Sequence, residues 1–130
     1  MEKQIVALFG EAEKGEYSVP YYLRSVEELA DRLGQPPADS RGLYLAVQAL
    51  LFDRQLFFIR VEEEGYSTND YLRGFDRLRQ QGLSRLAALC LPGVGCKEII
   101  GASSRLGLID QCLLLISESD LYDYLTFGGG

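Results

Sequence analysis

The sequence predicts an α/β protein, a three-layer sandwich in which a mainly parallel four-stranded sheet lies between two layers of helices. Residues 42–52 have the composition of a helix that is apolar almost all round, and such a helix is stable only when it is buried. Residues 56–61 follow as a short run rich in aromatic and β-branched residues, typical of a strand near the middle of a sheet. Because helix-like and strand-like segments alternate along the chain, the strands are expected to be mainly parallel.

The first half of the chain contains clear signals for the starts of helices. Ser25 and Glu28 form a capping box, so a helix is expected to start there. The prolines that follow this helix force an extended connection, after which Asp39 or Ser40 caps the next helix. The elements expected in this half are a strand at 4–9, a polar exposed loop at 10–20, helices at 26–33 and 41–52, and a strand at 56–61.

The second half continues the alternation of helices and strands. Thr68, Asn69 or Asp70 can cap a third helix, whose apolar residues lie three and four apart, and Gly82 is a natural residue to end it. Residues 117–120 cap a last short helix. The other elements expected here are a strand at 86–91, a helix at 97–106, and a strand at 111–116 that pairs with the strand at 86–91.

Length and charge limit the classes of partner. Residues 1–130 are predicted to form one domain with a disordered tail at 126–130. The 13 basic and 19 acidic residues give a net charge of −6, which argues against binding to nucleic acid or to an anionic membrane, since both need patches of Lys and Arg. The sequence shows no secretion signal and no apolar run of the roughly 18–20 residues that cross a membrane.

The residue types needed for common catalytic chemistry are missing or scattered. Histidine is absent, which removes the commonest general base and the commonest transition-metal ligand. Cys90, Cys96 and Cys112 are too scattered for a zinc site, and their odd number is typical of reduced thiols and a cytoplasmic location. None of the candidate acid–base carboxylates lies inside an apolar run that would desolvate it, and most are expected in helix caps or on solvated faces; they are Asp53, Asp70, Asp76, Asp110, Asp120 and Asp123. We therefore expect no catalytic residue, no metal and no cofactor.

A glycine-containing loop at 10–17 follows the first predicted strand, where a phosphate-binding loop would lie. It has the right glycine spacing, but Glu16 and Tyr17 stand where that motif needs Lys and Ser or Thr. Its three glutamates would repel a polyphosphate. An acidic loop without a nucleotide is the better interpretation.

A second glycine-rich turn, residues 92–97 (PGVGCK), allows two functional interpretations besides a simple sharp turn. Backbone amides of Gly93, Val94 and Gly95 at a helix start, together with the charge of Lys97, can form an anion-binding site. Alternatively, residues 91–100 resemble the hairpin of helix-hairpin-helix DNA-binding modules. That alternative requires residues 83–91 to form a helix, and their spacing alone does not exclude one.

Several short segments follow one another in a characteristic order. They are residues 6–10 (VALFG), 25–34 (SVEELADRLG), 42–52, 59–61 (IRV), 70–78 (DYLRGFDRL) and 89–93 (LCLPG). Taken in order, these segments resemble the central α/β region of tail sheath proteins from contractile phage tails and related injection machines. In that family a motif ending in Phe-Gly precedes an apolar helix, a strand ends in Val-Arg-Val, and a later strand ends in Ile-Pro-Gly.

This chain departs from the family in two respects. Residues 53–55 (DRQ) replace the Asn-Gly-Gly turn that usually introduces the second strand, and the chain lacks the long terminal arms and the further C-terminal domain. The resemblance therefore implies a minimal or shortened relative. It brings no catalytic residues with it.

The expected function is that of a non-enzymatic structural protein that self-associates in a sheath-like ring or filament, or that joins other components of a protein assembly. Two alternatives stay open. One is a small α/β domain that binds an anion or a nucleotide at the Gly93–Gly95 turn, and the other is a nucleic-acid-binding module of the helix-hairpin-helix type.

Overall fold

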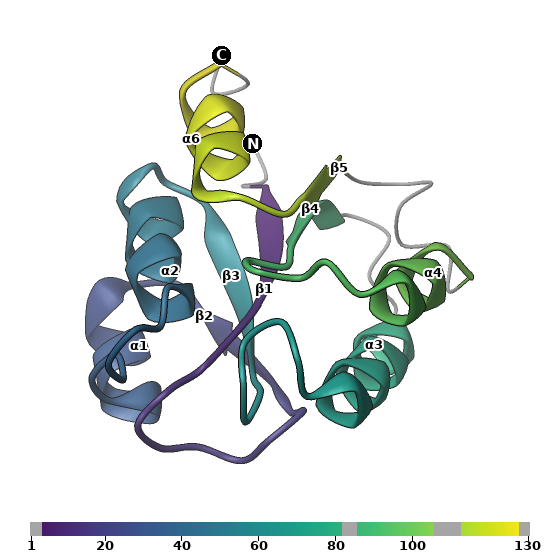
Figure 1. The fold of residues 1–130 in the computed structure, drawn as a ribbon. Coiled ribbons are helices and arrows are strands. Elements are labelled where there is room, and N and C mark those ends of the chain that lie inside the picture. Colours follow the sequence, from purple (N-terminus) through teal and green to yellow (C-terminus); the bar gives the residue numbers. More distant parts are fainter. Residues whose placement is uncertain (1–3, 82–85, 106–112, 128–130) are drawn as a thin grey trace.

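A computed structural model of the chain describes residues 4–81, 86–105 and 113–127, and it shows an α/β fold with five helices around a five-stranded mixed sheet (Figure 1). The strand order is β2-β3-β1-β4-β5. The elements, in chain order, are β1 (Ile5–Gly10), β2 (Pro20–Leu23), α1 (Val26–Leu33), α2 (Gly42–Leu51), β3 (Gln55–Arg60), α3 (Thr68–Gln80), β4 (Leu86–Cys90), α4 (Lys97–Arg105), β5 (Leu113–Leu115) and α6 (Glu118–Phe127).

Strand β1 lies in the middle of the sheet and pairs in parallel with β3 and β4. Leu8 of β1 lies opposite Phe58 on one side and Cys90 on the other. Strand β5 pairs in parallel with β4, which confirms the expected pairing of the last two predicted strands. Strand β2 runs antiparallel to β3, with Tyr21 opposite Phe58. The sheet is therefore mixed, and the expectation of four strands was wrong.

The missed strand β2 begins at Pro20 and lies at an edge of the sheet, where a residue without an N–H group is tolerated. The preceding loop was expected to be exposed throughout, and this was also wrong in part. Ala12 and Ser18 are buried, and the Ser18 hydroxyl donates to the main-chain carbonyl of Asp70 at 2.9 Å. The loop is thereby attached to the start of α3.

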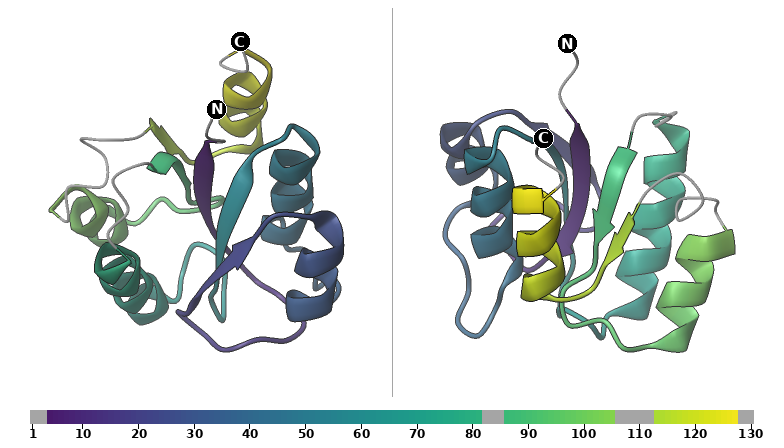
Figure 2. Two further views of the ribbon diagram at one scale, coloured as in Figure 1. Left: turned by 180° about the vertical axis from the view of Figure 1, so that it is seen from behind. Right: turned by 90° about the horizontal axis from the view of Figure 1, so that it is seen from above.

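Helices cover both faces of the sheet, as the view from above shows (Figure 2). Side chains of β1 alternate between the two faces, because successive residues of a strand point in opposite directions. Val6 and Leu8 pack with the buried residues of α1, α2 and α6. Ala7 and Phe9 pack with those of α3 and α4. The sheet thus has a hydrophobic core on each side.

The first and last helices start as predicted. The Ser25 hydroxyl accepts the N–H of Glu28 at 3.1 Å, and the Glu28 carboxylate accepts the N–H of Arg24 at 2.7 Å. At α6, the Ser117 hydroxyl accepts the N–H of Asp120 at 3.0 Å. Helix α6 continues to residue 127, so the predicted tail begins too early.

The side-chain caps predicted for α2 and α3 were wrong. Ser40 precedes α2, but its hydroxyl donates to the Pro37 carbonyl at 2.6 Å, and the residue at the cap position, Arg41, makes no side-chain capping bond. Helix α3 follows Ser67, whose hydroxyl bonds to the main chain of Glu63 instead of capping the helix. Gly82, Asp110 and Cys112, as well as residues 128–130, lie outside the described residues.

Candidate functional site

The carboxyl ends of β1 and β4 are the first place to look for a ligand site. Strand β1 connects to β3 through α1 and α2 on one face of the sheet, and β3 connects to β4 through α3 on the other face. The chain therefore reaches the two neighbours of β1 along opposite faces of the sheet, which creates a topological switch point, and open α/β sheets commonly bind ligands at such a point.

This position is filled by the chain's own Glu64, from the loop between β3 and α3. One carboxylate oxygen of Glu64 accepts the N–H groups of Glu11 and Gly42, each at 2.8 Å, and the other accepts the N–H of Arg41 at 2.9 Å. In return, the Glu11 carboxylate accepts the N–H of Glu64 at 3.0 Å. Amides at the start of a helix attract anions. Here Glu64 is that anion, and it supplies the cap that the residues before α2 do not.

Two glycines allow this close arrangement. Gly10 ends β1 and Gly42 starts α2, and a Cβ added to Gly42 would lie 2.7 Å from the Gly10 Cα and 2.9 Å from a carboxylate oxygen of Glu64. On the other side of Glu64, the backbone of Gly65 packs so closely on the carbonyl of Gly93 that a Cβ at Gly65 would overlap it. The loops after β1, β3 and β4 therefore pack directly on one another.

Of the predicted anion-binding residues, Gly93, Val94 and Gly95 lie in the loop between β4 and α4, and Lys97 is the first residue of α4. Val94 is buried with the core, and its N–H donates to the Leu91 carbonyl at 3.2 Å, so this amide is already bonded within the turn. Gly95 and Lys97 are exposed, and nothing lies within 4 Å of a Cβ added to Gly95. The four residues are neighbours at the start of α4, and Gly95 and Lys97 face open space.

Residues 86–90 form strand β4 and not a helix. The helix-hairpin-helix interpretation was therefore wrong, since it needs a helix directly before the turn. Periodicity could not separate the two cases, because a short apolar run fits a buried strand as well as a buried helix.

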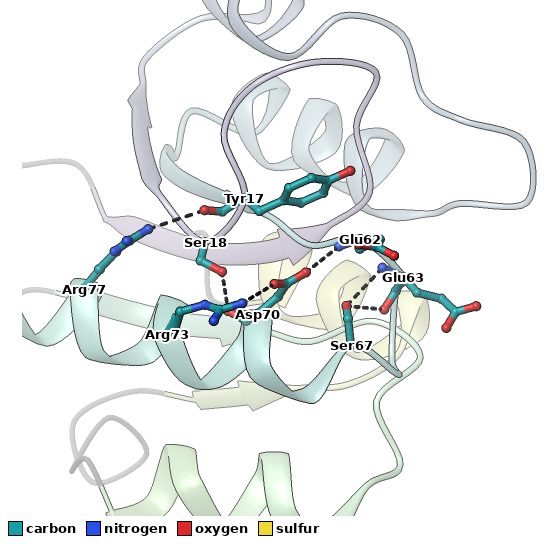
Figure 3. Close-up of polar contacts among 8 residues, drawn as sticks. All are labelled: Tyr17, Ser18, Glu62, Glu63, Ser67, Asp70, Arg73 and Arg77. Carbon is teal, nitrogen blue, oxygen red and sulfur yellow. Dashed lines mark hydrogen bonds and ion pairs between the residues drawn. The ribbon is translucent and has the colours of Figure 1, made fainter.

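Asp70, which was expected in a cap or on a solvated face, is buried in the first turn of α3. One of its carboxylate oxygens accepts the N–H of Glu62 at 2.9 Å, and the other pairs with Arg73 at 3.2 Å (Figure 3). Its main-chain carbonyl also accepts the hydroxyl of Ser18. Asp70 thus joins three segments of the chain, and both carboxylate oxygens are used in doing so.

Two buried groups have strongly shifted ionisation. Burial raises the pKa of the Cys90 thiol to about 12, with a further contribution from the negative charges of Asp120 and Glu64. Burial also raises the pKa of the Tyr71 phenol, although the N–H of Gly65, which the phenol oxygen accepts at 2.8 Å, opposes this shift. Both groups stay protonated at neutral pH, so neither is a nucleophile there.

Open grooves are found on the surface of α2. A groove between α2 and α6 has a volume of about 560 Å³ and is lined by Tyr44, Glu118 and Tyr122, among others. Tyr44 also lines a groove between α1 and α2 and a polar one at the start of α2. Tyr44 and Tyr122 are 61% and 60% exposed. We call the surface formed by Tyr44, Glu118 and Tyr122 the α2–α6 groove.

Residues that can hold a metal ion do not gather in the described part of the chain, where no three His, Cys, Asp or Glu side chains form a suitable group. None of the helices over residues 4–81, 86–105 and 113–127 combines the length and the apolar content needed to cross a bilayer.

A scan against models of protein families gives no match for the chain, and neither do comparisons with curated proteins and with solved structures.

The sequence prediction missed both Glu64 and the α2–α6 groove. Glu64 belongs to an acidic run that reads as a solvated end of a strand, and only the fold brings it to α2. The groove combines residues from two helices that are distant in the sequence. One signal was available: Tyr44 interrupts the apolar surface of α2 with a polar hydroxyl, which is typical of a partly exposed position.

Proposed function

We propose that this protein is a non-enzymatic assembly subunit that self-associates into a ring or a filament of the kind found in contractile tail sheaths. The observation that carries the proposal is the exposed aromatic surface of the α2–α6 groove, where Tyr44 and Tyr122 are 61% and 60% exposed. Large apolar side chains gathered on a surface are typical of protein–protein interfaces.

The carboxyl end of the sheet supports the same proposal. The amides of Glu11, Arg41 and Gly42, which would bind an anionic substrate there, are bonded to Glu64. The resemblance to tail sheath proteins adds a third argument, since that family builds large assemblies without catalysis. A cytoplasmic location belongs to the proposal as well, because Cys90 and Cys96 are free thiols.

Sedimentation velocity and light scattering test this function on the full chain. We expect the average mass to rise with protein concentration between low micromolar and millimolar, with rings or filaments visible by negative-stain electron microscopy at the upper end. A protein that stays monomeric over the whole range, both alone and mixed with other components of a tail-like assembly, would contradict the proposal.

A second candidate function, binding of a small anion at the turn before α4, is favoured by the exposure of Gly95 and Lys97. A thermal-shift panel of inorganic phosphate, nucleotides and sugar phosphates tests it. Binding at this turn predicts a rise in melting temperature that Gly95→Glu abolishes and Gly95→Ala keeps, because a methyl group meets nothing there. If none of these compounds stabilises the protein, this candidate is excluded.

A further inference from the structure

The two helix layers carry opposite net charge. Helix α6 contains three acidic residues and no basic one, α1 contains three acidic residues and one arginine, and α2 has no charged residue. Helix α3 contains three arginines and two aspartates, and α4 contains two basic residues and one acidic. The layer of α1, α2 and α6 therefore has a net charge of −5 and the layer of α3 and α4 a net charge of +2, on opposite faces of the sheet (Figure 2).

The α2–α6 groove has the chemistry that recognises a guanidinium group. Tyr44 and Tyr122 offer exposed aromatic faces, and Glu118 offers a carboxylate in the same groove. A guanidinium stacks on an aromatic ring while it donates to a carboxylate. Glu118 already accepts a guanidinium, that of Arg41 at 2.9 Å, and the two side chains are 63% and 66% exposed. An exposed pair of this kind contributes little stability and can exchange partners.

Arg77 on α3 is the arginine best able to enter such a groove. The two other arginines of α3 are engaged in ion pairs, Arg73 with Asp70 at 3.2 Å and Arg79 with Asp76 at 2.6 Å. Arg77 forms no ion pair with any described residue. Its guanidinium donates to the main-chain carbonyl of Tyr17 at 3.4 Å, which is a weak hydrogen bond (Figure 3). Binding Arg77 would therefore break no ion pair of its own subunit.

We propose that a second copy of this chain docks its α3, with Arg77 foremost, into the α2–α6 groove in a head-to-tail contact. This inference rests on the proposed self-association and adds which two surfaces meet. The two surfaces differ and lie on opposite faces of the sheet, so each contact leaves one groove and one α3 free for further copies. A contact of this type produces a ring when it closes and a filament when it does not.

Mixing two variants tests the head-to-tail contact. The groove variant, Tyr44→Ala/Tyr122→Ala, keeps α3, and the arginine variant, Arg77→Glu, keeps the groove. Each variant alone is expected to self-associate about tenfold more weakly, or worse, than the wild type, since central aromatic and arginine residues dominate interfaces. A mixture of the two is expected to form a heterodimer that grows no further, because each partner supplies the surface that the other lacks. Sedimentation velocity with a fluorescent label on one variant measures this species.

Two control variants separate this contact from general effects. Lys14→Glu makes the same change in charge as Arg77→Glu, but at an exposed position in the loop between β1 and β2. Tyr66→Ala removes a tyrosine that is 74% exposed and lies outside the groove. Both controls are expected to associate like the wild type. Circular dichroism and the melting temperature confirm that all variants are folded.

The possible outcomes separate this inference from the proposed function. If Arg77→Glu associates like the wild type while the groove variant does not, or if the mixture gives no heterodimer, the head-to-tail contact is wrong and self-association stands. If the wild type is monomeric at every concentration, both proposals fail. Heterodimers from the mixture, with unchanged controls, support both.

Discussion

The carboxyl end of the sheet and the α2–α6 groove differ in what occupies them. At the carboxyl end, the loops after β1, β3 and β4 pack on one another, and Glu64 bonds to the amide of Glu11 in the first of these loops and to the amides of Arg41 and Gly42 at the start of α2. In the α2–α6 groove, two tyrosines remain more than half exposed around a carboxylate. The position where the topology favours a ligand is filled from within, whereas the helix surface is open. Structural glycines and hydrogen bonds hold the first region together, and the second is the region where we propose that binding occurs.

The largest effect on stability is expected at the contact of Gly42 with Gly10. In Gly42→Ala, the added Cβ would lie 2.7 Å from the Gly10 Cα, so the helix or the strand must shift. We expect the free energy of unfolding to fall by about 3 kcal/mol, the upper part of the range for overpacking. Urea denaturation followed by circular dichroism measures it.

The matched control for this substitution is Gly95→Ala, because a Cβ there meets nothing within 4 Å. Its stability is expected to stay within about 0.5 kcal/mol of the wild type. Equal losses in the two variants would show that the end of β1 and the start of α2 are not packed as tightly as described.

A smaller loss of stability is expected when the internal anion is removed. Glu64→Ala leaves the N–H groups of Glu11, Arg41 and Gly42 without their acceptor, which we expect to cost about 2 kcal/mol. Glu63→Ala, the control at the exposed neighbouring position, is expected to change stability by less than about 0.5 kcal/mol.

Added anions sharpen this test. Formate or acetate can replace the lost carboxylate at the start of α2, so either one is expected to stabilise Glu64→Ala more than it stabilises the wild type. An equal response of the two proteins to these anions would mean that the amides do not form an anion site. Chloride at the same ionic strength controls for general salt effects.

Alkaline pH is expected to lower stability through Cys90. Its thiol ionises near 9.0 in the unfolded chain and near 12 in the folded protein. Below pH 9 both states keep the proton, and above it the unfolded state loses the proton first, so the free energy of unfolding falls as the pH rises from 9 towards 12. Urea titrations across this range are expected to show a shallower fall for Cys90→Ala. The same slope in both proteins would refute the assignment to Cys90.

The mildest effect is expected from salt, and it concerns association instead of folding. About 1 M salt shortens the screening distance to about 3 Å. This weakens the attraction between the acidic helix layer of one subunit and the basic helix layer of the next. The self-association constant should therefore fall as salt increases, while the melting temperature changes little. Association that strengthens with salt would indicate a purely apolar contact.

The sequence was sufficient to predict most elements of the fold because their signals are local. The capping patterns at Ser25 and Ser117 determine where α1 and α6 begin, and both were predicted correctly. The cap of α2 could not be predicted in this way, because its acceptor, Glu64, comes from a loop more than twenty residues later. Strand β2 was missed because it is short and starts with a proline, which reads as part of a loop.

The predicted anion-binding turn and the α2–α6 groove are two features that local sequence patterns cannot settle. The glycines at 93 and 95 do mark a sharp turn before α4, but whether it binds a ligand depends on which amides the fold leaves unbonded. The groove exists only because α6 packs beside α2, with Leu121 and Leu125 buried in the same core as Leu45 and Ala46. Such an arrangement has no signature in either helix alone.

Electron microscopy of the concentrated full chain tests the central claim most directly. The proposed head-to-tail contact predicts a ring or a filament in which Tyr44 and Tyr122 of each subunit are buried against α3 of the next, while the carboxyl end of the sheet keeps its internal packing. Isolated monomers, or an assembly whose subunits meet through the loops around Glu64 and leave both tyrosines exposed, would contradict it.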